Sequence, residues 1–175
     1  MGLNSIDDIF RLNDVMSKKL RSTVEGISPE KAEARPSADR WSVAEIVEHV
    51  AIVESGIGRI CAKLIGKAKA EELLSDDTFY LSPEFISGSE RIDDMKLEAP
   101  ERTHPKGSVS IADSLAMIDE SHEALSGLRE DIEKYDARAF KFPHPYLGDL
   151  SALEWLVLAG GHKSRHLKQI LDQLS

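Results

Sequence analysis

Cysteine is nearly absent from this sequence, which has one, Cys61, among its 175 residues. A single thiol cannot form a disulfide within the chain, and it excludes a zinc site built from several cysteines. The absence of a disulfide framework fits a reducing compartment, so we expect the protein in the cytoplasm. Any metal bound by this chain must be held by other side chains, and imidazoles are the natural candidates.

Long hydrophobic runs are also missing. The sequence has no apolar stretch of the roughly 18–20 residues that a membrane-spanning helix needs. The N-terminal segment MGLNSIDDIF is acidic and amphipathic, whereas a secretory signal peptide starts with a basic region followed by an apolar one. We therefore expect neither a membrane span nor a signal peptide.

Positive charge is in deficit, because 22 Lys and Arg face 31 Asp and Glu and the formal net charge is −9. Nucleic acids and anionic membranes select basic protein surfaces, so neither is an expected partner. Hydrophobic residues make up 41% and charged residues 30% of the chain, as in soluble globular proteins. The length predicts a single domain over residues 1–175.

Sustained alternation of apolar and polar residues is absent too, so we predict no β-strand. Apolar residues instead recur at helical spacing in four long segments, residues 6–27, 42–64, 110–132 and 151–174. The second and fourth segments start with capping boxes, Ser42 with Glu45 and Ser151 with Glu154. Pro29 predicts the first turn of a short helix between the first two segments.

The helical period disappears between residues 66 and 110, where prolines, glycines and scattered charges replace it. A connection of this length within one domain is usually functional, or partly ordered by short helices. We interpret it as a crossover that lies over a helical bundle. The predicted fold class is all-α, a four-helix bundle with a long crossover between its second and third helices. A turn-rich linker at residues 142–148 precedes the fourth helix.

Three histidines occupy positions where leucines would be expected. His162 and His166 are four residues apart, so both imidazoles project from one face of the fourth helix, and its neighbours are apolar. His49 lies on the apolar side of the second helix. A single buried histidine is usually satisfied by a carbonyl or hydroxyl group. Three on facing helices are satisfied together by a divalent metal, and antiparallel helices would bring them to overlapping depths.

Two stretches form a pattern, WSVAEIVEHV at residues 41–50 and HKSRHLKQI at residues 162–170. In this order, and with residues 99–107 and 144–148 between them, they resemble the DinB-like superfamily. The resemblance implies a four-helix bundle with a divalent metal, commonly nickel or zinc, on three ligands that match His49, His162 and His166. Similar members include thiol S-transferases that use low-molecular-weight thiols, a mycothiol-dependent maleylpyruvate isomerase and metal-dependent hydrolases. Similar proteins are often homodimers.

Three neutral imidazoles leave at least one coordination position open, which is typical of a catalytic metal site. An all-histidine set suits zinc, nickel, copper or iron better than magnesium or calcium. We therefore expect a metal-dependent enzyme that acts on a small molecule by thiol transfer or hydrolysis. The alternatives are a non-catalytic, metal-stabilised binding or stress-response module, and a helical interaction domain whose histidines only fill the core.

Several polar residues near this pattern have two interpretations. Glu45 can accept a hydrogen bond from a ligand imidazole, although its capping role explains it fully. His122 is either a further ligand, a substrate contact or a core histidine. His144 lies between two prolines and is expected in a turn. Arg165 either pairs with a glutamate or holds a carboxylate, and Cys61 is expected to be buried rather than nucleophilic.

Overall fold

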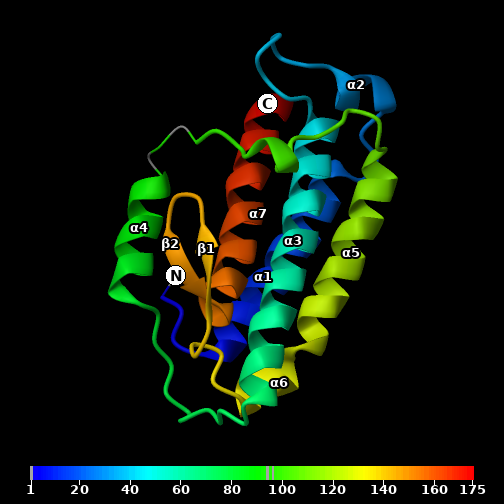
Figure 1. The fold of residues 1–175 in the computed structure, drawn as a ribbon. Coiled ribbons are helices and arrows are strands. Elements are labelled where there is room, and N and C mark those ends of the chain that lie inside the picture. Colours follow the sequence, from blue (N-terminus) through cyan, green and yellow to red (C-terminus); the bar gives the residue numbers. More distant parts are fainter. Residues whose placement is uncertain (1, 94, 96) are drawn as a thin grey trace.

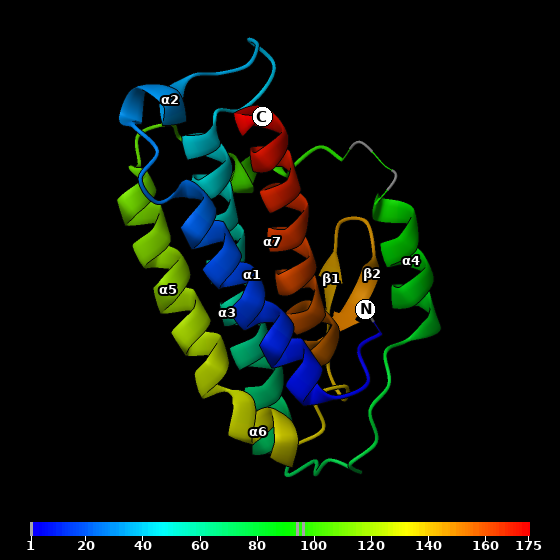
Figure 2. The ribbon, with the colours of Figure 1, turned by 180° about the vertical axis from the view of Figure 1, so that it is seen from behind.

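Four long helices form the body of the protein in the computed structural model, which describes residues 2–93, 95 and 97–175. They are α1 (Ile6–Val24), α3 (Val43–Ala70), α5 (Ile111–Gly127) and α7 (Ala152–Leu174). Helices α3 and α5 run in one direction and α1 and α7 in the other (Figures 1 and 2). The two antiparallel sets are packed against each other, because α3 contacts α7 and α1 contacts α5. The predicted four-helix bundle, with its crossover between the second and third long helices, is confirmed.

Short helices order the connections. Helix α2 (Pro29–Glu33) precedes α3, and α6 (Arg129–Lys134) follows α5. The crossover contains α4 (Pro83–Asp93) and the 3-10 turn η1 (Glu101–Thr103). Helix α4 stands beside the bundle, whereas η1 lies against α3 (Figure 1). The crossover therefore returns to the bundle at the N-terminal half of α3, where His49 is located.

The structure corrects the ends of three predicted helices, and the first of them ends at Val24, three residues before the predicted Ile27. Helix α3 continues to Ala70, six residues beyond the predicted end, because its buried side extends through Ile65 and Ala68. Lysines in its last turn also interact favourably with the helix dipole. The predicted helix over residues 110–132 is two helices, α5 and α6, which divide after Gly127. Glycine has a low helix propensity, so ending the helix at this position costs little free energy.

A β-hairpin replaces part of the predicted linker, so the prediction of no strand is wrong. Strands β1 (Lys141–His144) and β2 (Gly148–Ser151) pair antiparallel, with Lys141 opposite Ser151 and His144 opposite Gly148. Strands of four residues are too short to show a distinct alternation, and Pro143 disfavours a strand in a sequence-based prediction. A two-stranded ribbon tolerates this proline because each strand has a free edge.

The N-termini of α3 and α7 carry both predicted capping boxes. The Ser42 hydroxyl accepts from the Glu45 amide (3.2 Å), and the Glu45 carboxylate accepts from the Ser42 amide (2.8 Å). Ser151 and Glu154 repeat the arrangement at 3.3 and 2.8 Å. These local contacts fix where the two histidine-bearing helices begin, and therefore the depth of each histidine in the bundle.

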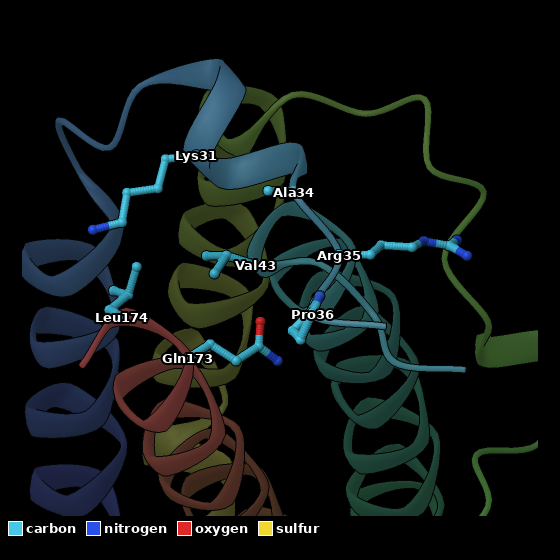
Figure 3. A pocket seen from close by; sticks show the side chains of 7 residues that line it. All are labelled: Lys31, Ala34, Arg35, Pro36, Val43, Gln173 and Leu174. Atoms are coloured by element: carbon cyan, nitrogen blue, oxygen red, sulfur yellow. The ribbon is translucent and has the colours of Figure 1, made fainter. Parts of the chain in front are cut away.

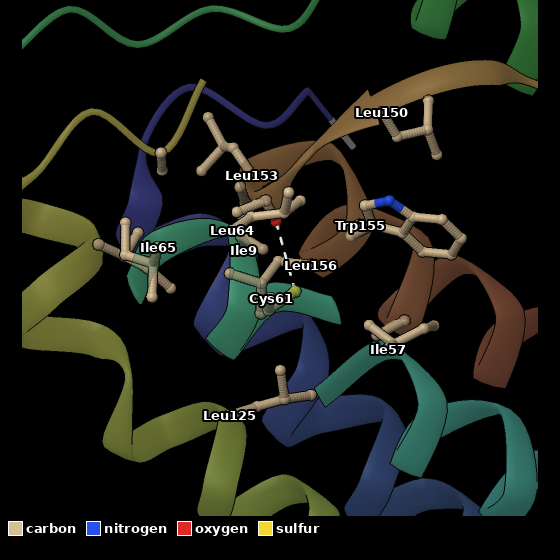
Figure 4. Close-up of a cluster of buried hydrophobic side chains, with 14 of the residues drawn as sticks. Ile9, Ile57, Cys61, Leu64, Ile65, Leu125, Leu150, Leu153, Trp155 and Leu156 are labelled. Carbon is tan, nitrogen blue, oxygen red and sulfur yellow. Dashed lines mark hydrogen bonds between the residues drawn. The ribbon is translucent and has the colours of Figure 1, made fainter. Parts of the chain in front are cut away.

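Two clusters of buried apolar side chains make up the core. One lies between the α7 N-terminus and the α3 C-terminus, where the Cys61 thiol points toward the Ala152 carbonyl (Figure 4). The other surrounds Ile46, Val50 and Ile170 at the opposite end. Close packing of α1 on α7 requires Gly160, since a Cβ there would lie 2.7 Å from Leu12 Cγ. Among the described residues, no helix is both long and apolar enough to cross a membrane.

Candidate metal centre

The three histidines singled out by the sequence meet between α3 and α7. The Nε2 atom of His162 is 3.2 Å from Nε2 of His49 and 3.2 Å from Nε2 of His166. One ring nitrogen from each residue lies within 4.8 Å of the other two. The antiparallel arrangement of the two helices brings the three side chains to the same level along the helix axes. Three imidazole nitrogens this close form a group that could hold a metal ion.

Hydrogen bonds on the far side of two rings set their tautomers. His49 Nδ1 is 2.7 Å from the Thr103 carbonyl oxygen, and His166 Nδ1 is 3.0 Å from Gln169 Oε1. Both oxygens can only accept, so each Nδ1 carries the proton and donates it. The Nε2 atoms of His49 and His166 are therefore unprotonated, and the lone pair of each faces His162 Nε2.

Burial keeps this histidine cluster neutral. Desolvation, followed by repulsion from the other imidazoles, lowers the pKa of His162 well below its usual value. Desolvation also lowers the pKa of His166 to about 4 and lowers that of His49. A single N–H on His162 would have to serve two inward-facing lone pairs at once. A divalent cation satisfies all three nitrogens together, so the donor set fits a metal.

The crossover supplies the carbonyl that orients His49. Glu48, the neighbour of His49 on α3, is buried and accepts hydrogen bonds from the backbone amides of Lys106 (2.9 Å) and Gly107 (3.0 Å). This carboxylate holds the chain just after η1 against α3, and Thr103 belongs to η1. Sequence reasoning missed this role of Glu48. A charged residue within an otherwise apolar stretch was the available signal.

An aromatic side chain covers one side of the histidine cluster. The Trp41 ring centroid is 4.9 Å from that of His49 and 5.7 Å from that of His104. His104 is exposed, and its Nε2 is 2.8 Å from the Ala99 carbonyl oxygen. The tryptophan of the 41–50 pattern thus helps to shield the buried imidazole, while His104 remains outside the cluster.

Glu45 and His122 lie apart from the cluster. The Glu45 carboxylate caps α3 and forms an ion pair with Arg35, with Arg35 Nε 2.8 Å from Oε2. Its capping role therefore accounts for it. His122 Nε2 is 2.8 Å from Asp14 Oδ1 on α1, and His122 is not one of the grouped nitrogens.

His144 has the expected turn role, since its Nδ1 accepts from the amides of Tyr146 and Leu147, both at 3.2 Å. Burial and the nearby Arg102 lower the pKa of His144 to about 4. Arg165 donates to the carbonyls of Ile92 (2.9 Å) and Met95 (2.7 Å), and the described residues contain no glutamate paired with it. Cys61 is buried, as expected.

A separate hollow of about 210 Å³ lies where α2, the start of α3 and the end of α7 meet (Figure 3). It is lined by Lys31, Ala34, Arg35, Pro36, Val43, Gln173 and Leu174. The Arg35 side chain points out of it, toward Glu45 and the crossover (Figure 3). None of its lining residues belongs to the histidine cluster, so the two features are distinct.

The fold and the cluster together define a class of protein, a four-helix bundle with three neutral histidines converging from two antiparallel helices. A family model described as the DinB superfamily matches residues 14–170, and the chain belongs to this superfamily. The resemblance seen in the sequence is thereby confirmed.

Known relatives agree with this membership. The chain is similar to the uncharacterized protein YuaE of Bacillus subtilis (strain 168), with 23% identity over 150 residues that cover 85% of this chain and 86% of YuaE. Among solved structures it is similar to TT2238, described as a four-helix bundle protein, with a TM-score of 0.62 and 23% identity. That likeness covers 96% of this chain and 99% of TT2238, and it supports the fold.

Proposed function

We propose that this protein is a metal-dependent enzyme that acts on a small molecule, with His49, His162 and His166 as ligands of a nickel or zinc ion. The observation that carries the proposal is the pair of inward-facing Nε2 lone pairs, each 3.2 Å from His162 Nε2 in a buried, neutral cluster. Neutral imidazoles are the form of histidine that binds metals. Their partners Thr103 and Gln169 act as the outer hydrogen-bond acceptors that metal-bound histidines usually have.

Three protein ligands leave room for a substrate or water at the metal. When bound, the ion would supply Lewis acidity, which acidifies a bound water or thiol and polarises a carbonyl group. The chain itself contributes the fixed ring orientations of His49 and His166 and the exclusion of water from one side by Trp41. The number of grouped nitrogens, three among the described residues, favours an open catalytic site over a site closed by protein ligands.

The nucleophile is proposed to come from outside the chain. Cys61 is the only cysteine of the sequence, and desolvation raises its pKa to about 12. A buried thiol with this pKa is a poor nucleophile. The nucleophile would then be a low-molecular-weight thiol or a water molecule, and the ion held by His49, His162 and His166 would acidify it; these two cases correspond to thiol transfer and hydrolysis.

The same proposal places the protein in the cytoplasm and gives it the form of a homodimer.

Metal analysis of protein produced without a histidine tag tests the proposal. We expect about one nickel or zinc ion per chain, in line with a three-ligand site. His162→Ala should lose the metal, whereas His122→Gln, a matched control outside the cluster, should keep it. A protein that contains no metal and shows no affinity for Zn²⁺ or Ni²⁺ would contradict the proposal. A metal whose coordination positions are all filled by protein atoms would favour the non-catalytic module instead.

A further inference from the structure

Arg165 lies on the helix that carries His162 and His166, and its guanidinium is held by two backbone carbonyls. It follows His162 by three residues on α7, and side chains at this spacing are neighbours on a helix surface. Its Nη1 donates to the carbonyl of Ile92 in α4, and its Nη2 donates to that of Met95. The guanidinium therefore reaches from α7 to the crossover, where both of its carbonyl partners lie.

Half of the ten arginines form ion pairs among the side chains that the structure describes, and Arg165 is not one of them. Five arginines there form ion pairs with aspartate or glutamate: Arg11, Arg21, Arg35, Arg129 and Arg138. Arg165 has no such ion pair among the side chains that the structure describes. The two carbonyls occupy two of its five N–H donors, and they do not neutralise its charge. Three of its donors therefore have no hydrogen-bond partner among the side chains that the structure describes.

The electrostatic surroundings of the cluster favour an anion. After desolvation and the other imidazoles, Lys163 and Arg165 also lower the pKa of His162, and Arg165 lowers that of His166. Both of these side chains are cations, and Lys163 is itself neutralised by Glu54. A divalent metal on three neutral imidazoles would add two further positive charges. With the ion bound, the cluster would therefore be a cationic spot in a chain whose net charge is −9, and such a spot attracts anionic ligands.

We propose that Arg165 is a substrate-binding residue that holds a carboxylate of the small molecule whose other end reacts at the histidine cluster. This inference rests on the proposed function and names the substrate class, a small molecule with a carboxylate and a second group that reaches the metal. The planar fork of a guanidinium matches the two oxygens of a carboxylate, and such bidentate pairs are among the stronger hydrogen-bonded contacts in proteins.

Two thiols of similar length provide the test. The γ-mercaptobutyrate anion carries a carboxylate, and mercaptobutanol carries a hydroxyl group in the same place. Both present a thiolate to the metal, and the chain between the two groups is too long for favourable chelation of the same ion. Titration calorimetry on nickel- or zinc-loaded protein measures the ratio of their dissociation constants. We expect the wild-type protein to prefer γ-mercaptobutyrate by at least about tenfold, equal to about 1.4 kcal/mol.

Substitution of the arginine should remove this preference selectively. In Arg165→Gln we expect a ratio close to one and an unchanged affinity for mercaptobutanol. Arg165→Lys keeps the charge without the planar fork and should retain part of the preference. Lys168→Gln is the matched control, because Lys168 is exposed on the same helix and its substitution removes the same charge. Metal content and far-ultraviolet circular dichroism establish that each variant is folded and loaded.

The outcomes separate this inference from the proposed function. Equal affinity of the metal-loaded wild-type protein for the two thiols, failure of both to bind, or an undiminished preference in Arg165→Gln overturns the assignment of Arg165 and leaves the metal site standing. A wild-type chain that takes up no metal overturns the proposed function itself.

Discussion

Lys163 and Glu54 form an ion pair in the interior of the bundle, with side chains that are 1% and 3% exposed. The pair joins α7 to α3, the same two helices that bring the histidines together, and Lys163 directly follows His162. Burial raises the pKa of Glu54 although the neighbouring ammonium acts in the opposite direction. The second oxygen of Glu54 has no hydrogen-bond partner among the described residues. Such a pair specifies which helix faces meet, at a substantial desolvation cost.

Loss of one member of this pair should be far more harmful than loss of both. Lys163→Met leaves the Glu54 carboxylate buried and unpaired, so we expect a loss of about 3–5 kcal/mol in the free energy of unfolding. The double variant Lys163→Met with Glu54→Leu should recover most of this loss, since two apolar side chains fill the same space without a charge. Urea unfolding measures both. A double variant no more stable than the single one would contradict this explanation.

Local patterns in the sequence predicted most of the fold and the cluster. The capping boxes at Ser42 and Ser151 fix helix starts from contacts three residues long, and the spacing of His162 and His166 fixes their common face. The contacts of Glu48 and Arg165 were not predictable in this way. Their partners lie 58 to 73 residues away in the chain, within a crossover that has no helical period. Only the folded chain brings such groups together.

Glu48 is expected to control metal affinity through the crossover. Glu48→Gln leaves one oxygen to accept from two amides, which should loosen residues 106–107 and, with them, the Thr103 carbonyl on His49. Loss of an outer partner of a ligand histidine typically weakens metal binding by about 10–100-fold. Competition with a chromophoric chelator measures the affinity. Glu120→Gln, on the exposed side of α5, is the control and should bind metal like the wild type. Equal affinities for all three proteins would exclude this role.

Cys61 should be unreactive in the folded protein. Desolvation raises its pKa from 9.0 to about 12, so almost no thiolate exists at pH 8 and the sulfur is also inaccessible. We expect an aromatic disulfide reagent to label about one thiol per chain in guanidinium chloride and almost none under native conditions. Because the folded-state pKa lies above the unfolded one, this group's contribution to stability is complete below pH 9 and is lost as the pH rises toward 12. Cys61→Ser should remove that part of the decline. Rapid labelling of the native protein would show that the thiol is accessible.

Metal binding should stabilise the native state in proportion to its affinity. A ligand that binds only the folded chain adds about 2.7 kcal/mol at a concentration one hundred times its dissociation constant. We therefore expect Zn²⁺ or Ni²⁺ to raise the melting temperature of metal-stripped protein, and EDTA to reverse the rise. His49→Leu removes one of the three nitrogens and fills its space with an apolar group, so its melting temperature should be insensitive to both reagents. His104→Gln, which alters an exposed histidine next to the same tryptophan, should respond like the wild type. If the wild-type melting temperature is unchanged by metal and by EDTA, the histidines serve only as core side chains.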